Sequence, residues 1–224
     1  MKKVLISMSG GIDSSTLAVF LSEKYDVYPI TFQYGSNHNL YELEKLYEFL
    51  SAHNMKLPIV ISLRNIFRSA MDKSSLLGGE IPEGHYQAEN MRSTVVPGRN
   101  LLFISTMAAI AEAQEIDSIA LGAHQGDHFI YPDCRNDFIK SAKKTVLLSS
   151  DQKIELLTPF VLCDKAEIVR IGLDLNIDYS LTRTCYKDQE TACGLCGSCN
   201  ERLGAFALNN VIDPIEYQVQ VPAR

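Results

Sequence analysis

The distribution of apolar residues along the chain follows two alternating periods. Short runs of consecutive apolar and β-branched residues are typical of buried strands, and apolar residues spaced by three and four positions are typical of helices that bury one face. The short runs lie at residues 4–8, 27–33, 57–63 and 118–122, and the longer periodic segments at 14–24, 40–52, 99–114, 135–147 and 164–173. Repeated strand–helix units of this length predict an α/β fold, a doubly wound parallel sheet with helices on both faces.

One stretch departs from this pattern. Residues 69–98 are irregular and rich in Gly, Glu and Ser, and a loop of this length in a compact domain is usually functional or mobile. We find no internal repeat, no low-complexity tract and no linker rich in Gly, Ser or Pro. We therefore expect one α/β domain over residues 1–180, with a C-terminal segment over residues 181–224 packed on it.

Composition narrows the class of protein. Of the 224 residues, 46% are hydrophobic and 21% are charged, which is enough for a sizeable core and gives no sign of disorder. The formal net charge of −6 argues against a general nucleic-acid coat, because a surface that neutralises many phosphates is basic. We therefore expect small-molecule ligands and no nucleic-acid partner.

The N-terminal run of apolar residues is short. Only residues 4–8 precede Ser9, whereas a signal peptide or a membrane span needs a longer apolar stretch. We expect a cytoplasmic protein without membrane contact. A homodimer is the assembly we expect.

A glycine-rich loop follows the first expected strand. It consists of Ser9, Gly10, Gly11, Ile12, Asp13, Ser14 and Ser15. Glycine lets a phosphate approach the backbone amides, and the helix behind the loop supplies unpaired N–H groups and a positive dipole end. A carboxylate here suits a turn cap or a ligand of Mg²⁺. The loop of kinases and GTPases, with Lys after its last Gly, is absent. The alternative is a plain strand-to-helix turn capped by Asp or Ser.

The run Ser9 to Ser14 resembles the pyrophosphate loop of the N-type ATP pyrophosphatases, the PP-loop superfamily. Four more blocks follow in one order: Val96 to Asn100, Tyr131 to Arg135, Asp164 to Glu167, and closing cysteines with Asn200 and Arg202. Together, over about residues 4–206, they resemble the 7-cyano-7-deazaguanine synthase family. This resemblance implies a Rossmann-like fold of the adenine nucleotide alpha-hydrolase type.

The resemblance also implies an activity. It is that of an ATP-dependent C–N ligase of the queuosine pathway, which converts 7-carboxy-7-deazaguanine and ammonia to 7-cyano-7-deazaguanine through adenylated intermediates and releases AMP and pyrophosphate. It implies catalytic roles for Asp13, Arg99 and Lys165, with Mg²⁺ accompanying ATP. The ATP-binding residues that we expect are Met8, Ser9, Gly10, Gly11, Ile12, Asp13, Ser14, Ser15 and Gln33. A lysine at a helix start opposes the helix dipole, so we expect Lys165 to contact a phosphate; a solvated lysine is the alternative.

Substrate-binding residues are expected in two further loops. These residues are His38, Asp127, Asp133 and Arg135, because a carboxylate suits the N–H donors of a deazaguanine edge. The alternative for Asp133 and Arg135 is a helix cap beside a surface arginine. Two departures from the family pattern affect this site: Gln33 replaces an acidic residue, and residues 126–130 read Gly-Asp-His-Phe-Ile instead of Thr-Asp-x-Ser-Gly.

Four of the six cysteines crowd near the C-terminus. Cys185, Cys193, Cys196 and Cys199 form the pattern C-x7-C-x2-C-x2-C, and four thiolates in this array indicate tetrahedral Zn²⁺. A closed shell of four ligands leaves no open position, so we expect a structural metal. An iron–sulfur cluster with four cysteine ligands is the alternative. Cys134 and Cys163 are expected not to be ligands.

Two other functions remain open at this point. One is a PP-loop paralogue that acts on another acceptor, such as a tRNA base, a protein or an amide-stage deazaguanine. The other is a zinc-stabilised nucleotide-binding module without turnover. Release of AMP in the presence of 7-carboxy-7-deazaguanine separates both from the synthase.

Overall fold

A computed structural model describes residues 1–68, 74–86 and 89–220. Its centre is one parallel sheet in the order β3-β2-β1-β4-β5. The strands are β1 (Lys2–Ser7), β2 (Tyr25–Gln33), β3 (Ile59–Ser62), β4 (Ser118–Ala120) and β5 (Glu155–Leu157). The order reverses between β1 and β4, so the chain winds outward in both directions from the centre, and this point is where such sheets bind ligands.

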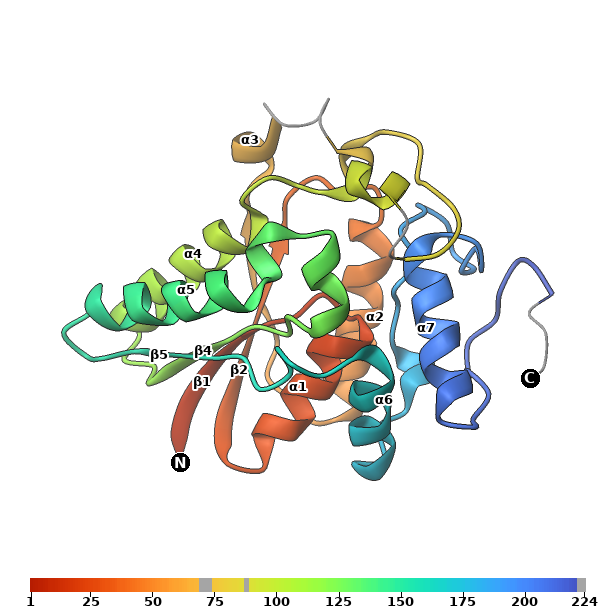
Figure 1. Cartoon of the computed structure of the whole chain (residues 1–224). Coiled ribbons are helices and arrows are strands. Elements are labelled where there is room, and N and C mark those ends of the chain that lie inside the picture. The colour runs from red at the N-terminus through yellow and green to blue at the C-terminus, as the bar shows by residue number, and fades with distance from the viewer. Residues whose placement is uncertain (69–73, 87–88, 221–224) are drawn as a thin grey trace.

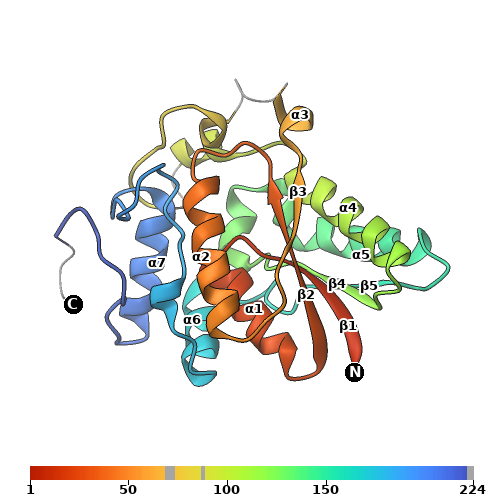
Figure 2. The ribbon, with the colours of Figure 1, turned by 180° about the vertical axis from the view of Figure 1, so that it is seen from behind.

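Helices cover both faces of the sheet. They are α1 (Ile12–Ser22), α2 (Asn39–Ala52), α3 (Arg64–Phe67), α4 (Arg99–Ala113), α5 (Asn136–Leu148), α6 (Lys165–Asp174) and α7 (Gly197–Leu208). Helices α4 and α5 lie on one side, and α1, α2 and α6 lie on the other, with α7 outside α6 (Figure 1; Figure 2). The predicted doubly wound α/β fold is confirmed.

The side chains of β1 show why both faces need cover. Val4 and Ile6 pack in the cluster under α1, α2 and α6, and Leu5 between them packs in the cluster under α4 and α5. All three are fully buried, as expected for a central parallel strand whose alternate residues point to opposite faces.

Among the α-helices and strands of the described residues, three were absent from the prediction. The strand β5 has only three residues, and α3 has four, so neither is long enough to show a period. The third is α7, which starts inside the cysteine-rich segment at Gly197 and contains Gly204, both poor helix formers. Packing against α6 stabilises it instead.

The irregular stretch at 69–98 is partly described. It contains two short 3-10 helices, η2 (Ser75–Leu77) and η3 (Glu89–Thr94). Residues 69–73 and 87–88 of this stretch lie outside the described part. Leu76, Leu77 and Met91 are buried, so the described part of the loop belongs to the core.

Among the described residues, one segment passes a length and composition test for a membrane span. It runs from Glu89 to Ala113, has 25 residues and reaches a mean hydropathy of 1.3. The η3 helix ends at Thr94 before α4 begins at Arg99, and the buried residues of α4 pack in the core against β1 and β4. An apolar core helix passes the same test, so this is weak evidence for membrane contact.

Candidate active site

A cavity of about 190 Å³ opens at the carboxyl ends of β1, β2 and β4. It is lined by residues 7–9 at the end of β1, by Thr31, Phe32 and Tyr34 at the end of β2, and by residues 121–124 after β4. It therefore lies at the switch point of the sheet, where the sheet rule predicts a ligand. Its walls come from α1, α2, α4, α6, α7 and the segments between them.

The glycine-rich loop forms one end of the cavity. Gly10 has a φ of 82°, and a Cβ there would lie 2.7 Å from the carbonyl oxygen of Glu42, so the turn requires glycine. The backbone N–H of Ser9 donates to Ser14 Oγ (3.2 Å), and the N–H of Gly11 donates to Ser9 Oγ (3.3 Å). Gly11 caps α1 without a side-chain hydrogen bond, so the start of the helix keeps donors for an anion.

Asp13 and Lys165 meet across this end of the cavity. Lys165 Nζ, at the first residue of α6, donates to Asp13 Oδ2 (2.5 Å) and lies 3.3 Å from Glu201 Oε2 of α7. Burial acts to lower the pKa of Lys165, but the carboxylates of Asp13 and Glu201 outweigh it and raise the pKa above its usual value. Asp13 Oδ1 is buried and has no hydrogen-bond partner among the described residues.

His124 and Asp127 extend this network. Nδ1 of His124 accepts the N–H of Gly126 (3.1 Å), so in the neutral ring Nε2 carries the proton and faces Asp127 Oδ1 at 3.4 Å. The hydroxyl of Tyr86 donates to the same oxygen (2.8 Å). Burial acts to raise the pKa of Asp127, but His124, Lys165 and the Tyr86 hydrogen bond outweigh it and hold the pKa below its usual value.

The opposite wall carries an arginine between aromatic rings. The guanidinium carbon of Arg99 lies 5.7 Å from the ring centroids of both Tyr34 and Tyr131. Its Nη1 donates to the Tyr34 hydroxyl (3.3 Å). Within the described part of the chain, no carboxylate forms an ion pair with Arg99, so its charge is available to an anionic ligand.

His38 and Glu42 lie one helical turn apart on the same wall. His38 Nε2 is 3.5 Å from Glu42 Oε1, and Nδ1 of the buried His38 has no partner among the described residues. Burial lowers the pKa of His38 to about 3. Burial also raises the pKa of Glu42 to about 8, although the positive charges of Arg99 and Arg183 act to lower it. At neutral pH both side chains are therefore mainly uncharged, and the contact is not an ion pair.

Most of the predicted site residues line this one cavity. They are Met8, Ser9, Gly11, Asp13, Ser14, His38, Arg99, Asp127 and Lys165. Gly10, Ile12 and Ser15 belong to the same loop but are not among the lining residues, and Gln33 ends β2, where its carbonyl accepts the N–H of Leu63.

Two predicted substrate residues do not reach the cavity. Asp133 Oδ2 accepts the backbone N–H of Asn100 (2.8 Å) and so caps the start of α4. Arg135 is exposed, and its Nε donates to the carbonyl of His128 (3.0 Å). Arg135 thus lies on the surface, as in the alternative, whereas Asp133 binds the start of α4 and not the start of the helix that follows it.

The sequence pattern missed many of the cavity residues. Four that carry ionisable side chains are Glu42, Tyr86, Arg183 and Glu201. For Glu42 the sequence did hold a local signal: it follows His38 by four residues, and this spacing puts both side chains on one helix face. The other three come from segments far apart in the chain, and only the tertiary fold brings them here.

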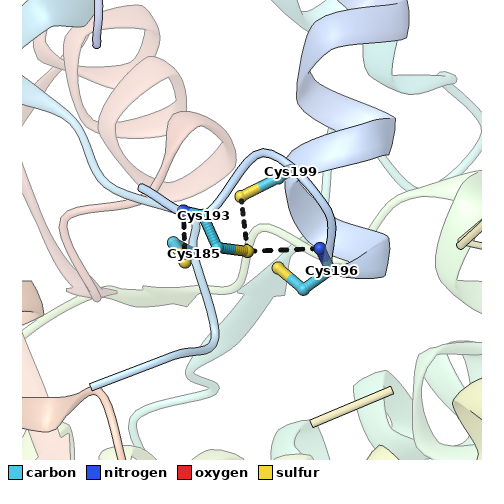
Figure 3. A group of neighbouring side chains, drawn as sticks. All are labelled: Cys185, Cys193, Cys196 and Cys199. Atoms are coloured by element: carbon cyan, nitrogen blue, oxygen red, sulfur yellow. Dashed lines mark hydrogen bonds between the residues drawn. The ribbon is translucent and has the colours of Figure 1, made fainter. Parts of the chain in front are cut away.

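The four clustered cysteines lie together, close to the first turn of α7 (Figure 3). Their Sγ atoms lie within 4.8 Å of one another, and all four side chains are buried. The backbone N–H groups of Leu195 and Cys196 donate to Cys193 Sγ at 3.4 and 3.2 Å, which favours a thiolate. The cluster can therefore bind a metal. Cys134 and Cys163 lie outside it, as predicted.

The fold and the loop define the class: an α/β protein of the PP-loop ATP pyrophosphatase type. Residues 3–210 match the model of the family described as queuosine biosynthesis protein QueC, and the chain belongs to this family. It is 43% identical over 222 residues to the 7-cyano-7-deazaguanine synthase of Marinomonas sp. (strain MWYL1), covering 97% of this chain and 99% of the relative. The 7-cyano-7-deazaguanine synthase of Caldicellulosiruptor saccharolyticus is 42% identical over 98% of this chain and 97% of its own length. The predicted family is confirmed.

One solved structure has a similar fold. The tRNA thiolase NcsA from Methanococcus maripaludis, described with its 4Fe–4S cluster, has a TM-score of 0.50 to this chain. The match covers 93% of this chain and 64% of that one, at 14% sequence identity. At this identity the likeness is one of fold.

Proposed function

We propose that the chain is an ATP-dependent ligase that converts 7-carboxy-7-deazaguanine and ammonia to 7-cyano-7-deazaguanine. The observation that carries the proposal is the meeting of the PP-loop, Asp13 and Lys165 at one end of a cavity in a chain of the QueC family. Two relatives that match over nearly their whole length carry the name of this activity.

The reaction needs two adenylations. In the first, a carboxylate oxygen of the substrate attacks the α-phosphate of ATP, and pyrophosphate leaves. Ammonia then attacks the acyl carbon, loses a proton and expels AMP, which gives the amide. In the second, the amide oxygen attacks the α-phosphate of another ATP, and pyrophosphate leaves. The adenylated amide then expels AMP and loses the two remaining nitrogen protons to give the nitrile. Each adenylation turns a poor leaving group into AMP.

The cavity residues suit the charge that develops on pyrophosphate. The N–H groups at the start of α1, the Lys165 ammonium and the Arg99 guanidinium are donors or cations that face one cavity. Asp13 Oδ1, a buried carboxylate oxygen without a partner among the described residues, is the atom that we expect to bind Mg²⁺. Bound Mg²⁺ would neutralise phosphate charge there.

The other walls suit the deazaguanine and adenine rings. Asp127 can accept from ring N–H groups, and His38 has a free Nδ1 within the described structure. Phe32 and Phe103 stack with centroids 4.1 Å apart and offer an apolar surface. Asp133, Arg135 and Gln33 stay predictions for ligand contact, since their side chains do not line the cavity.

The cysteine cluster fits a structural zinc. Tetrahedral coordination at a Zn–S distance of about 2.3 Å implies sulfur separations of roughly 3.8 Å. Cys193 and Cys199 Sγ already lie 3.9 Å apart. A closed Cys₄ set offers no site for a reactant, so we assign it a structural role.

The remaining assignments concern the protein as a whole. We propose a cytoplasmic homodimer with small-molecule ligands only and without membrane contact. We also keep the division into an ATP pyrophosphatase domain at 1–180 and a metal-binding segment at 181–224. The net charge of −6 supports the absence of a nucleic-acid partner.

The decisive experiment is incubation of the purified protein with 7-carboxy-7-deazaguanine, ammonium and Mg-ATP, followed by mass analysis. We expect the amide and then the nitrile, with two AMP formed for each nitrile. ADP as the nucleotide product would exclude the PP-loop chemistry. AMP formed only with a different acceptor would favour a paralogue, and ATP binding without any product would favour a module without turnover.

A further inference from the structure

The cysteine cluster and the cavity share a wall. Five cavity residues lie within two positions of a cluster cysteine: Arg183, Thr184, Tyr186, Ser198 and Glu201. The first three flank Cys185, and the last two flank Cys199. The segment that binds the metal is therefore also the segment that presents polar and charged groups to the ligand.

The start of α7 is tied to the cysteine loop by one side chain. Nδ2 of Asn200 donates to the carbonyls of Leu195 (2.8 Å) and Cys196 (3.3 Å) in that loop, and to the carbonyl of Gly84 (2.8 Å). Because these carbonyls lie on two separate segments, the first turn of α7 has little freedom to rotate. Its orientation sets the direction of the neighbouring Glu201.

The carboxylate of Glu201 is held from two sides. One oxygen, Oε2, lies 3.3 Å from Lys165 Nζ. The other, Oε1, lies against Gly126, where a Cβ would approach to 2.6 Å, so any larger residue at 126 would displace it. The chain thus leaves space for this carboxylate beside Lys165.

Lys165 needs a second carboxylate when a nucleotide binds. Its ammonium donates to Asp13 Oδ2, and Asp13 also supplies the buried oxygen expected to bind Mg²⁺. If the ammonium stayed on Asp13, it would compete with Mg²⁺ for the same carboxylate. Glu201 offers Lys165 another anionic partner and so leaves Asp13 to the metal.

We propose that Glu201 is a positioning residue that holds the Lys165 ammonium while Asp13 binds Mg-ATP, and that the cysteine loop sets Glu201 through Asn200. This inference rests on the proposed function only in requiring ATP in this cavity. Glu201 itself takes no part in bond making.

The test compares the wild type with Glu201→Gln, which removes the charge and keeps the shape. A matched control is Glu155→Gln, at the exposed first residue of β5. We expect Glu201→Gln to raise the Mg²⁺ concentration for half-maximal rate and the Kd of α,β-methylene-ATP about tenfold, the scale of one lost charge-assisted contact. The KM for 7-carboxy-7-deazaguanine and the Tm should change little, and Glu201→Asp should restore part of the affinity.

The outcomes separate this inference from the proposed function. An active wild type whose Mg²⁺ dependence and nucleotide affinity are unchanged in Glu201→Gln overturns the inference alone. A wild type that binds α,β-methylene-ATP but makes no nitrile defeats the proposed function, and the inference is then decided by the Kd ratio. A wild type that does not bind the analogue overturns both.

The link to the cysteine loop has its own variant. Asn200→Ala leaves all four cysteines in place and should also raise the Kd of α,β-methylene-ATP. In the double variant with Glu201→Gln the two effects should not add, because both act through one carboxylate. Simple addition of the two effects would show that Asn200 acts elsewhere and would overturn the link.

Discussion

At the scale of single residues, the cavity is organised by charge compensation. Lys165 is buried among Asp13, Asp127 and Glu201, while Arg99 on the opposite wall lies between the rings of Tyr34 and Tyr131 and forms no ion pair within the described part of the chain. The charge of Lys165 is therefore already balanced by carboxylates, whereas the charge of Arg99 is not balanced by an ion pair within the described structure. An anion that enters the cavity can therefore bind Arg99 on one wall. On the other wall, Lys165 can exchange a carboxylate partner for a phosphate.

Replacement of Asp13 tests the centre of this network. We expect Asp13→Asn to lower the rate of AMP and pyrophosphate formation by about a hundredfold or more, as loss of a group that stabilises transition-state charge does. The Tm should change little, because Glu201 still pairs with Lys165. The control is Asp174→Asn, at the exposed far end of α6. A variant with wild-type pyrophosphate release would show that Asp13 has no part in the chemistry.

Replacement of Glu42 gives a prediction about pH. Its pKa rises from 4.5 to about 8 in the folded protein, so between these pH values the folded state holds a proton that the unfolded state has lost. The free energy of unfolding therefore falls as pH rises through this window. Glu42→Gln cannot lose a proton there, and its stability should fall less. At about 1.4 kcal/mol per pKa unit, the difference between pH 5 and pH 8 is a few kcal/mol.

Urea unfolding at pH 5, 6, 7 and 8 measures this difference. Glu44→Gln, an exposed site on the same helix, should keep the pH dependence of the wild type. The lowered pKa of His38 makes the free energy of unfolding rise with pH between about pH 3 and 6.5. Every variant contains His38, so this contribution should largely cancel when their stabilities are compared. Parallel curves for the wild type and Glu42→Gln would show that Glu42 is ionised in the folded state at neutral pH.

At the scale of elements, the sequence predicted what local pattern determines. The major helices α1, α2, α4, α5 and α6 carry apolar residues three and four positions apart, and this spacing predicted them. The loop from Ser9 to Ser14 was recognisable because its residues are contiguous. By contrast, Glu201 lies on α7, whose two glycines weaken the helical signal in the sequence. It contacts Lys165 only because α7 packs on α6. Contacts between distant segments leave no such pattern.

The start of α6 shows how a local signal sets a functional residue. The Asp164 side chain accepts the backbone N–H of Glu167, and the Glu167 side chain accepts the N–H of Asp164, each at 2.8 Å. This capping box fixes the first turn, which carries Lys165.

Removal of the cap should therefore affect both stability and ATP binding. Asp164→Ala should cost about 1 kcal/mol and lower the Tm by about 2–4 °C. It should also raise the KM for ATP, because Lys165 loses its fixed turn. Asp164→Ser can still cap the helix and should remain close to the wild type in both measurements. If the serine variant behaves like the alanine variant, the cap is not the cause.

At the scale of the whole molecule, the C-terminal segment completes the domain. The cluster cysteines belong to the same buried core as β2 and α4, and the buried Arg202 pairs with Asp213 at 2.7 Å to fasten the tail. In the stretch from Cys185 to Cys199, Leu195 is 40% exposed and adds little burial. The Arg183 guanidinium donates to the carbonyls of Lys187, Gln189 and Glu190 in this stretch, and we expect metal coordination by the cysteines to add to these hydrogen bonds.

Loss of one cysteine should show how far the fold depends on that metal. Metal binding free energy becomes folding free energy where the ligands come together only in the folded chain. We expect about one zinc per purified chain. Cys196→Ser should lower the Tm by at least about 10 °C and reduce solubility, with activity lost as a consequence. Cys163→Ser, a half-buried thiol outside the cluster, should keep both zinc and Tm. A folded, active preparation without zinc, or a brown one containing iron, would contradict the structural-zinc assignment.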